Sequence, residues 1–214
     1  MEKKNKALVK ACIIGNLAAV EKAIDEGANV NYKEEHGHTP LLIASNSGDI
    51  ELVKMLISKG ADISSKTSFG STALNIASGL GYIEVVEFLI KNGANVNNKN
   101  RTGSSPLTSA VSKNNIEIVK LLLANGATID NLTIDSAKNK EVKDILDKWP
   151  HSMAILALQE NHTYNVHDMS YLEDLDAYMG KKGTDYGKGK RKNKESKKMK
   201  SKKSKKSIRK IKKA

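Results

Sequence analysis

Apolar and polar positions recur along the first two thirds of the chain in a pattern that predicts pairs of short helices. In one copy, Thr39 and Pro40 are typical of a helix start, and the apolar run that follows them stops near Gly48. A second segment over 50–57 has apolar residues spaced for one buried face, and Gly60 supplies the positive φ that ends a helix. Neither helix can bury its apolar side within one copy, so the copies are expected to stack.

The copies repeat with a period of 33 residues, and several independent series of small or apolar residues keep this spacing. The series are Gly27, Gly60, Gly93 and Gly126; Ala11, Ala44, Ala77 and Ala110; Val20, Val53, Val86 and Val119; and Gly37, Gly70 and Gly103. Such self-similarity is typical of repeat proteins built from stacked helical units. The predicted fold class is therefore all-α, a solenoid of helix-turn-helix units with projecting turns.

The segment Gly37-His38-Thr39-Pro40-Leu41-Leu42-Ile43-Ala44 resembles the ankyrin signature Gly-x-Thr-Pro-Leu-His-x-Ala. The segments Gly60-Ala61-Asp62 and Gly93-Ala94-Asn95-Val96-Asn97 are similar to the ending of an ankyrin repeat. The resemblance implies an ankyrin-repeat solenoid. Leu42, Asn75 and Thr108 replace the histidine of the signature, so its hydrogen bonds to the preceding turn are expected to be absent.

Three regions are predicted along the chain. Residues 1–149 form the repeat domain, with an N-terminal cap at 4–36, repeats at 37–69, 70–102 and 103–131, and a C-terminal cap at 132–149. Residues 150–180 form a short helical trailer, in which Ser170 and Glu173 make a capping box. This trailer either packs on the exposed end of the stack or serves as a separate docking helix. Residues 181–214 form a disordered Lys-rich tail.

The resemblance implies that an unidentified partner protein binds the concave face, which the turn tips and first helices line. The positions on this face are Glu35, His36, His38, Asn46, Ser47, Phe69, Ser71, Leu80, Arg101, Thr102, Ser104 and Lys113. Phe69 stands out, because aromatic side chains and Arg often dominate the energy of an interface. Alternatively, Phe69 folds back onto its own repeat, and Arg101 and Lys113 are solvated charges.

Charge separates the tail from the rest of the chain. Residues 181–214 contain 18 Lys or Arg and two acidic residues, a net of +16, which leaves −4 for residues 1–180 out of a total of +12. Two dense basic runs include Lys188, Lys190, Arg191 and Lys192, then Lys202, Lys203, Lys205 and Lys206. Such a tail is expected to bind nucleic acid or another polyanion, to target the nucleus, or only to solubilise. A non-specific nucleic-acid-binding protein that acts through this tail is thus an alternative function.

Catalytic and metal-binding patterns do not emerge from the sequence. Cys12 falls where the repeat places a small buried side chain, and His36 and His38 have no cysteine beside them. Every glycine in the repeats fits a helix end or a turn, so there is no phosphate-binding loop. We expect a non-catalytic interaction module without a cofactor or metal.

A single cysteine excludes an intramolecular disulfide and favours a reducing compartment. The charged start lacks the apolar core of a signal peptide, and no apolar run approaches the roughly 20 residues that cross a bilayer. The sequence thus predicts an intracellular monomer, cytoplasmic or nuclear, that does not use a membrane.

The bias toward Lys, Asn and Ile, together with the compact repeats and the Lys-Ser terminus, resembles the ankyrin proteins that giant DNA viruses encode. In poxvirus relatives, an F-box-like segment that recruits ubiquitin ligase machinery often follows the repeats, and residues 150–180 occupy that place. They lack a Leu-Pro opening, so this activity is not carried over. A viral adaptor that recruits host machinery through residues 150–180 is a further alternative.

Overall fold

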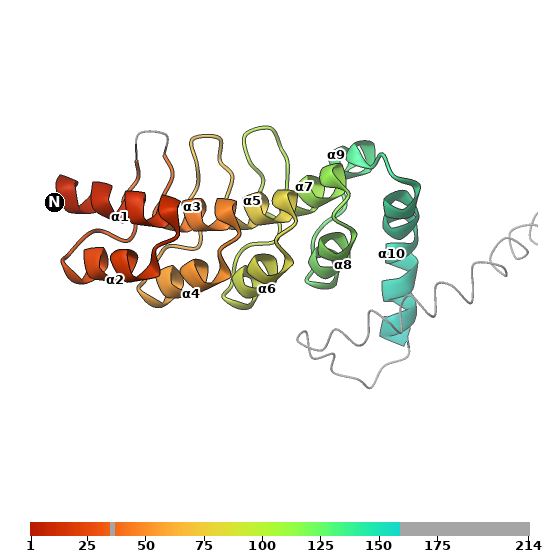
Figure 1. Cartoon of the computed structure of the whole chain (residues 1–214). Helices are drawn as coiled ribbons and strands as arrows, with labels where there is room; N and C mark the ends of the chain where they lie inside the picture. The colour runs from red at the N-terminus through yellow and green to blue at the C-terminus, as the bar shows by residue number, and fades with distance from the viewer. Residues whose placement is uncertain (35–36, 159–214) are drawn as a thin grey trace, which may run out of the picture. The chain divides into compact units, whose positions relative to one another are not determined.

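A computed structural model describes residues 1–34 and 37–158, with side chains as far as Trp149. The described residues fold into helices and turns and contain no strand (Figure 1). This confirms the predicted all-α class. The helices are α1 (Glu2–Ile14), α2 (Leu17–Asp25), α3 (Pro40–Ser47), α4 (Ile50–Ser58), α5 (Ala73–Leu80), α6 (Ile83–Lys91), α7 (Pro106–Lys113), α8 (Ile116–Ala124), α9 (Asn131–Ser136) and α10 (Lys140–Leu158).

The helix ends follow the local signals in the sequence. At the start of α3, the Thr39 hydroxyl accepts a hydrogen bond from the Leu42 amide, and Pro40 occupies the first turn. Gly48 ends α3 with a φ of 72°, and Asp49 then caps α4 by accepting from the Leu52 amide. One glycine and one capping side chain thus turn the chain from the first helix of a repeat into the second.

The core lies between the helix pairs. First helices contact one another in the order α1, α3, α5, α7 and α9, and each of the first four also contacts the second helix of its own repeat. Figure 1 shows the first helices as one row and α2, α4, α6 and α8 as another. The alanines and valines of the 33-residue series are buried at Ala44, Ala77, Ala110, Val53, Val86 and Val119. Small side chains therefore let neighbouring first helices approach closely.

Neighbouring repeats also meet where α3 ends. A Cβ atom at Gly48 would lie 2.6 Å from the Tyr82 ring, and Tyr82 belongs to the next repeat. The equivalent Cβ at Gly81 would lie 3.2 Å from Asn115 Oδ1. Glycine is required at these helix ends both for its positive φ and for the space that the following repeat occupies.

The turns between repeats are closed by the same backbone hydrogen bond each time. The amides of Glu34, Thr67 and Asn100 donate to the carbonyls of His38, Ser71 and Ser104. The turns project from the first-helix row (Figure 1). The Arg101 amide also donates to the Phe69 carbonyl at 2.9 Å, so two successive turns are joined at their tips.

Asn75, one of the residues that replace the signature histidine, makes hydrogen bonds to the following turn, which the sequence did not predict. Its Nδ2 atom donates to the carbonyls of Asn98 and Ser104, each at 3.3 Å, and its Oδ1 atom accepts from the Thr72 amide at 3.0 Å. An amide side chain can reach the following turn and cap its own helix at once, because it carries both donors and an acceptor. At Leu42 the side chain is buried and apolar, so no such bond forms there.

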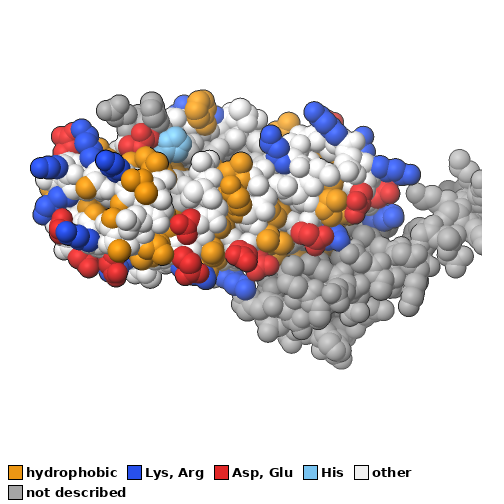
Figure 2. Space-filling model, viewed as in Figure 1, with side chains coloured by type: hydrophobic (Ala, Val, Ile, Leu, Met, Phe, Trp, Pro, Cys, Tyr) orange, Lys and Arg blue, Asp and Glu red, His pale blue; other side chains and the backbone are white. Residues whose placement is uncertain are grey.

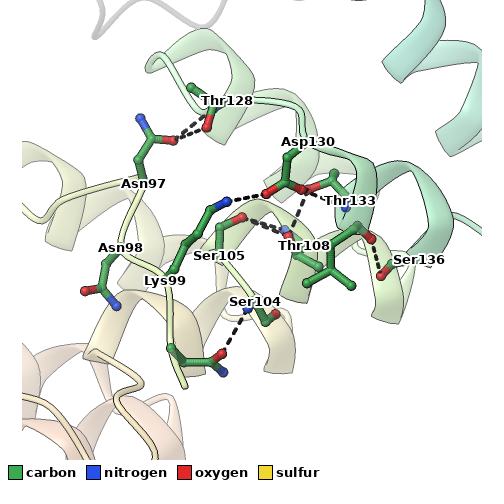
Figure 3. A network of polar contacts seen from close by, with 12 residues as sticks. Asn97, Asn98, Lys99, Ser104, Ser105, Thr108, Thr128, Asp130, Thr133 and Ser136 are labelled. Carbon is green, nitrogen blue, oxygen red and sulfur yellow. Dashed lines mark hydrogen bonds and ion pairs between the residues drawn. The ribbon is translucent and has the colours of Figure 1, made fainter. Parts of the chain in front are cut away.

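A polar network joins α7, α9 and the turn before α7 (Figure 3). Asp130 Oδ2 accepts from Lys99 Nζ at 2.6 Å, and Asp130 Oδ1 accepts from the Thr133 amide at 2.9 Å. Thr133 Oγ1 lies 2.8 Å from Thr108 Oγ1. The hydrogen bond from Lys99, followed by that from Thr133, lowers the pKa of Asp130 to about 2. The short helix α9 is therefore fixed to its neighbours by polar contacts.

Helix α10 buries one side, which includes Val142, Ile145, Leu146 and Trp149. The helix continues to Leu158 and so passes through position 149, where the repeat domain was expected to end. Side chains beyond Trp149 lie outside the described residues, as do Glu35, His36, residues 159–180 of the trailer and the tail at 181–214. The predictions for the trailer, the adaptor role of 150–180 and the basic tail stay predictions. Among the described helices, none is both long and apolar enough to span a bilayer.

Candidate protein-interaction surface

We call the side chains that the first helices and the projecting turns present to solvent the first-helix surface. It contains most of the residues that the sequence predicted for partner binding. Asn46, Ser47, Phe69, Leu80, Arg101, Thr102 and Lys113 are exposed, whereas His38, Ser71 and Ser104 are half-buried. The prediction thus separates into residues that are free to contact a partner and residues that are partly enclosed in the turns.

Phe69 projects from the tip of its turn. Its side chain is 72% exposed, so it does not fold back onto its own repeat. The Thr67 hydroxyl accepts from the amides of Phe69 and Ser71, both at 3.2 Å, and this holds the turn closed. The ring is therefore presented to solvent from an ordered backbone rather than buried within the fold.

The half-buried polar residues build the turns. His38 Nδ1 lies 2.9 Å from Glu34 Oε1, and the same carboxylate oxygen accepts from the His38 amide at 3.0 Å. In the third turn, Asn100 Oδ1 accepts from the Ser104 amide at 2.9 Å. His38 and Ser104 are thus held by hydrogen bonds within their own turns, and these bonds shape the surface.

An apolar stripe on α5 extends the surface away from the turn. Leu80 is 49% exposed, and Ile76 lies one helical turn before it on the same side of α5 and is half-buried. Ile43 occupies the equivalent position on α3 and is also half-buried. Ile43 and Ile76 were not predicted from the sequence. They stand 33 residues apart and four positions before Ser47 and Leu80, and this spacing is the signal that identifies them.

The surface also includes α1. Ile13 and Ile14 are 67% and 66% exposed, and they stand 33 residues before Asn46 and Ser47. Neither residue was predicted, because this region was expected to act only as a cap. The same repeat positions that mark Asn46 and Ser47 would have identified them.

Charge is distributed unequally between the two sides of the repeats. Residues 63–82 and 96–115 form the second and third turns with α5 and α7, and they contain no Asp or Glu. The same residues include the cations Lys66, Lys99, Arg101 and Lys113. The second helices carry the acidic residues Glu51, Glu84 and Glu117, all exposed and spaced by 33. Figure 2 shows acidic side chains along the edge that the second helices form. The first-helix surface is thus apolar and basic in its central part.

Two kinds of reactive chemistry, a thiolate and a bound metal, find no support in residues 1–34 and 37–149. Cys12 is buried, and burial raises the pKa of its thiol to about 12, so a reactive thiolate does not form at neutral pH. No three His, Cys, Asp or Glu residues gather as a metal site within 1–34 and 37–149.

A comparison with protein families agrees with the repeat geometry. A family model of ankyrin repeats in three copies matches residues 1–67 and 44–133. A comparison with curated proteins gives no significant match.

Proposed function

Since this chain belongs to the ankyrin-repeat family, whose repeats form protein-protein interaction modules, we propose that it binds a partner protein through its first-helix surface. The observation that carries this proposal is the exposure of Phe69 and Leu80 on an ordered backbone. Burying one large apolar side chain contributes about 1.5 to 3 kcal/mol. Such side chains left in solvent are suited to the centre of an interface, where a few residues supply most of the binding energy.

Arg101 supports the same surface. Its amide donates a hydrogen bond to the Phe69 carbonyl, so the two residues are neighbours at the turn tips. Aromatic residues and Arg are enriched among the residues that dominate interfaces. Phe69 and Arg101 therefore form the pair whose loss is expected to weaken binding most.

The test compares the full chain with a Phe69→Ala, Arg101→Ala variant in pull-downs with a partner identified by crosslinking. Loss of the two side chains is expected to weaken binding by about 2 kcal/mol or more, roughly thirtyfold. A Glu84→Ala, Lys91→Ala variant, changed at exposed positions of α6 in the second-helix row, is the matched control and should bind as the wild type does. Both variants should keep the wild-type melting temperature, because all four changed side chains are exposed in the folded chain. Equal binding by wild type and the first variant would reject the proposal.

A second candidate function is binding of nucleic acid or another polyanion through residues 181–214, favoured by their net charge of +16. Replacing Lys188, Lys190, Arg191, Lys192, Lys202, Lys203, Lys205 and Lys206 with Gln in the full chain is expected to reduce both affinity for a labelled oligonucleotide and its dependence on salt. Measuring the affinity at several salt concentrations gives the slope of log affinity against log salt concentration. A slope that stays at the wild-type value would contradict a tail-driven role.

The predicted nuclear targeting has a separate test. A fluorescent reporter fused to residues 181–214 should accumulate in the nucleus if the Lys-rich runs act as an address, and a fusion with the Gln-substituted tail is the control. A diffuse signal from both fusions would leave the tail without this role.

A further inference from the structure

The charge and apolar character of the first-helix surface define what kind of partner it fits. Resting on the proposed function, we infer that this surface takes an acidic protein segment in which carboxylates stand beside large apolar side chains. The inference depends on two pairs of side chains, each made of one exposed apolar residue and one exposed cation from the next repeat.

The first pair is Phe69 and Arg101 at the turn tips. The hydrogen bond from the Arg101 amide to the Phe69 carbonyl keeps the two residues adjacent. The guanidinium is exposed, and no ion pair joins it to a carboxylate within 1–34 and 37–149. A partner residue pair of one apolar side chain and one carboxylate would satisfy both groups, since Arg binds carboxylates through two parallel hydrogen bonds.

The second pair is Leu80 and Lys113 at the ends of α5 and α7. These residues hold the same repeat position, 33 apart, on helices that pack against each other. Helix axes in contact lie about 8 to 10 Å apart, a separation that neighbouring side chains of one bound segment can span. Lys113 is exposed and, in the described part of the chain, forms no ion pair. The motif of an apolar anchor followed by a cation is therefore used twice.

The two pairs lie toward opposite ends of α5, so one bound segment must run along this helix to reach both. Helix α5 has eight residues and spans about 12 Å. Phe69 lies in the turn before α5 and Leu80 ends it. A segment that reaches both pairs needs two apolar anchors with a carboxylate near each.

Charge also disfavours other occupants of this surface. Lys99 is paired with Asp130, so it contributes little to the positive field of the surface. The tail at 181–214 has the same sign as the surface and is not a favourable ligand for it. Nucleic acid is disfavoured because its affinity grows with the number of phosphates that cations neutralise, and the exposed cations without an ion pair among the described residues of the second and third turns, α5 and α7 are few: Lys66, Arg101 and Lys113. An acidic and apolar protein segment remains as the complementary partner.

The test selects ligands from a displayed library of random short peptides on the full-length chain. A Phe69→Ser, Leu80→Ser variant with the same tail is screened in parallel, so that peptides held by the tail appear with both proteins. Peptides that bind only the wild type should contain Asp or Glu together with Phe, Leu, Ile or Trp well above their share in the library. Their affinity should fall roughly five- to tenfold in an Arg101→Gln, Lys113→Gln variant. A Lys54→Gln, Lys91→Gln variant on the second helices should bind them as the wild type does.

The outcomes distinguish this inference from the proposed function. Surface-dependent peptides without an excess of acidic residues, or with affinities that the Arg101→Gln, Lys113→Gln change leaves unaltered, would overturn the inference and leave protein binding by this surface intact. Failure to find any surface-dependent peptide would count against both. A labelled single-stranded oligonucleotide that binds the wild type more tightly than the Arg101→Gln, Lys113→Gln variant, with the tail constant, would assign the surface to nucleic acid and overturn the inference.

Discussion

A single buried hydroxyl shows how a repeat position can tolerate very different residues. Ser78 Oγ is the one buried side-chain oxygen or nitrogen without a hydrogen-bond partner among the described residues. Ser45, at the same repeat position, donates its hydroxyl to the Leu41 carbonyl at 2.8 Å. Cys12 and Val111 hold this position in the other repeats and are buried as well. The position thus accepts an apolar side chain, and the hydroxyl of Ser78 gains nothing there.

Ser78→Ala is expected to raise the free energy of unfolding by about 1 kcal/mol, because it removes a buried polar group that has no partner. Ser45→Ala is the matched control and should lower the free energy of unfolding, since it deletes a hydrogen bond that is made. Urea denaturation monitored by circular dichroism measures both changes. Two variants that shift in the same direction and by the same amount would show that the Ser78 hydroxyl is satisfied.

At the scale of helices and turns, local signals were sufficient to predict where elements begin and end. Thr39, Pro40 and Gly48 act on residues within one helix, so their effect can be read from the sequence. The bonds of Asn75 could not be predicted in this way, because Asn98 and Ser104 are brought near it only when repeats stack. The sequence showed that a polar side chain replaces the signature histidine, but it did not show which atoms that side chain would contact.

Asn75→Ala is expected to cost about 2 kcal/mol or more of unfolding free energy. The change leaves the buried amide of Thr72 and the carbonyls of Asn98 and Ser104 without these bonds. Asn92→Ala provides the control, since Asn92 is exposed and its Nδ2 atom donates only to the Phe88 carbonyl of its own helix. Denaturant melts compare the two. A loss no larger than that of the control would mean that Asn75 does not brace the turn.

The stability of α9 is expected to depend on pH through Asp130. The pKa of this carboxyl is about 2 in the folded chain against an ordinary 3.8, so the unfolded chain binds more protons between about pH 4 and pH 2. Stability from this group is complete above about pH 4 and is lost as the pH falls toward 2. Asp130→Asn should therefore lower stability by about 1 kcal/mol near neutral pH and by less near pH 2.

Chemical denaturation at a series of pH values tests this dependence. Asp135→Asn, an exposed change on the same helix, is the control for the effect of a charge alone. If the difference between Asp130→Asn and wild type were constant across the acidic range, the proposed linkage would be wrong.

Across the whole stack, the junctions between repeats are not equivalent. Asn31 Nδ2 donates to the Gly60 carbonyl while its Oδ1 accepts from the Asp62 amide, and Asn97 makes the same two bonds to Gly126 and Thr128. The middle junction has Ser64 at this position, and its hydroxyl donates to Asp62 within its own turn. The central repeats are therefore joined without the two-point bridge that both flanking junctions have.

Ser64→Asn is expected to raise stability by about 1 kcal/mol, because the amide can form the same two bonds to Gly93 and Asn95 that the flanking junctions show. The Ser64 amide already donates to Asp62 Oδ1, as the Asn31 amide does to Asn29 Oδ1, so the backbone suits the change. Ser64→Ala removes the hydroxyl without adding the bridge and should not stabilise the chain. Thermal melts of both variants test this prediction. A lower melting temperature for Ser64→Asn than for wild type would show that the junctions differ in backbone conformation as well.

The periodic sequence predicted the stack and the exposed turn tips, because both follow from one 33-residue pattern. It did not predict that Ile13 and Ile14 extend the surface, since the first repeat was considered only as a cap. Nor was it used to show that His38 and Ser104 are held within their turns, although their partners Glu34 and Asn100 lie only four residues earlier. Roles of the trailer and the Lys-rich tail lie outside the described residues and rest on the sequence.

The glycines at the ends of α3 and α5 bear on how such a chain can lengthen. At the end of α7 the corresponding residue is Asn114, which is exposed and adopts a φ of 61°. A tandem duplication that placed a further repeat after α8 would bring a new capping residue against the Asn114 side chain, whereas Tyr82 and Asn115 meet glycines, Gly48 and Gly81, at the earlier junctions. Enlargement of the array in that direction would thus need a mutation to glycine at 114 before the extra copy could be accommodated.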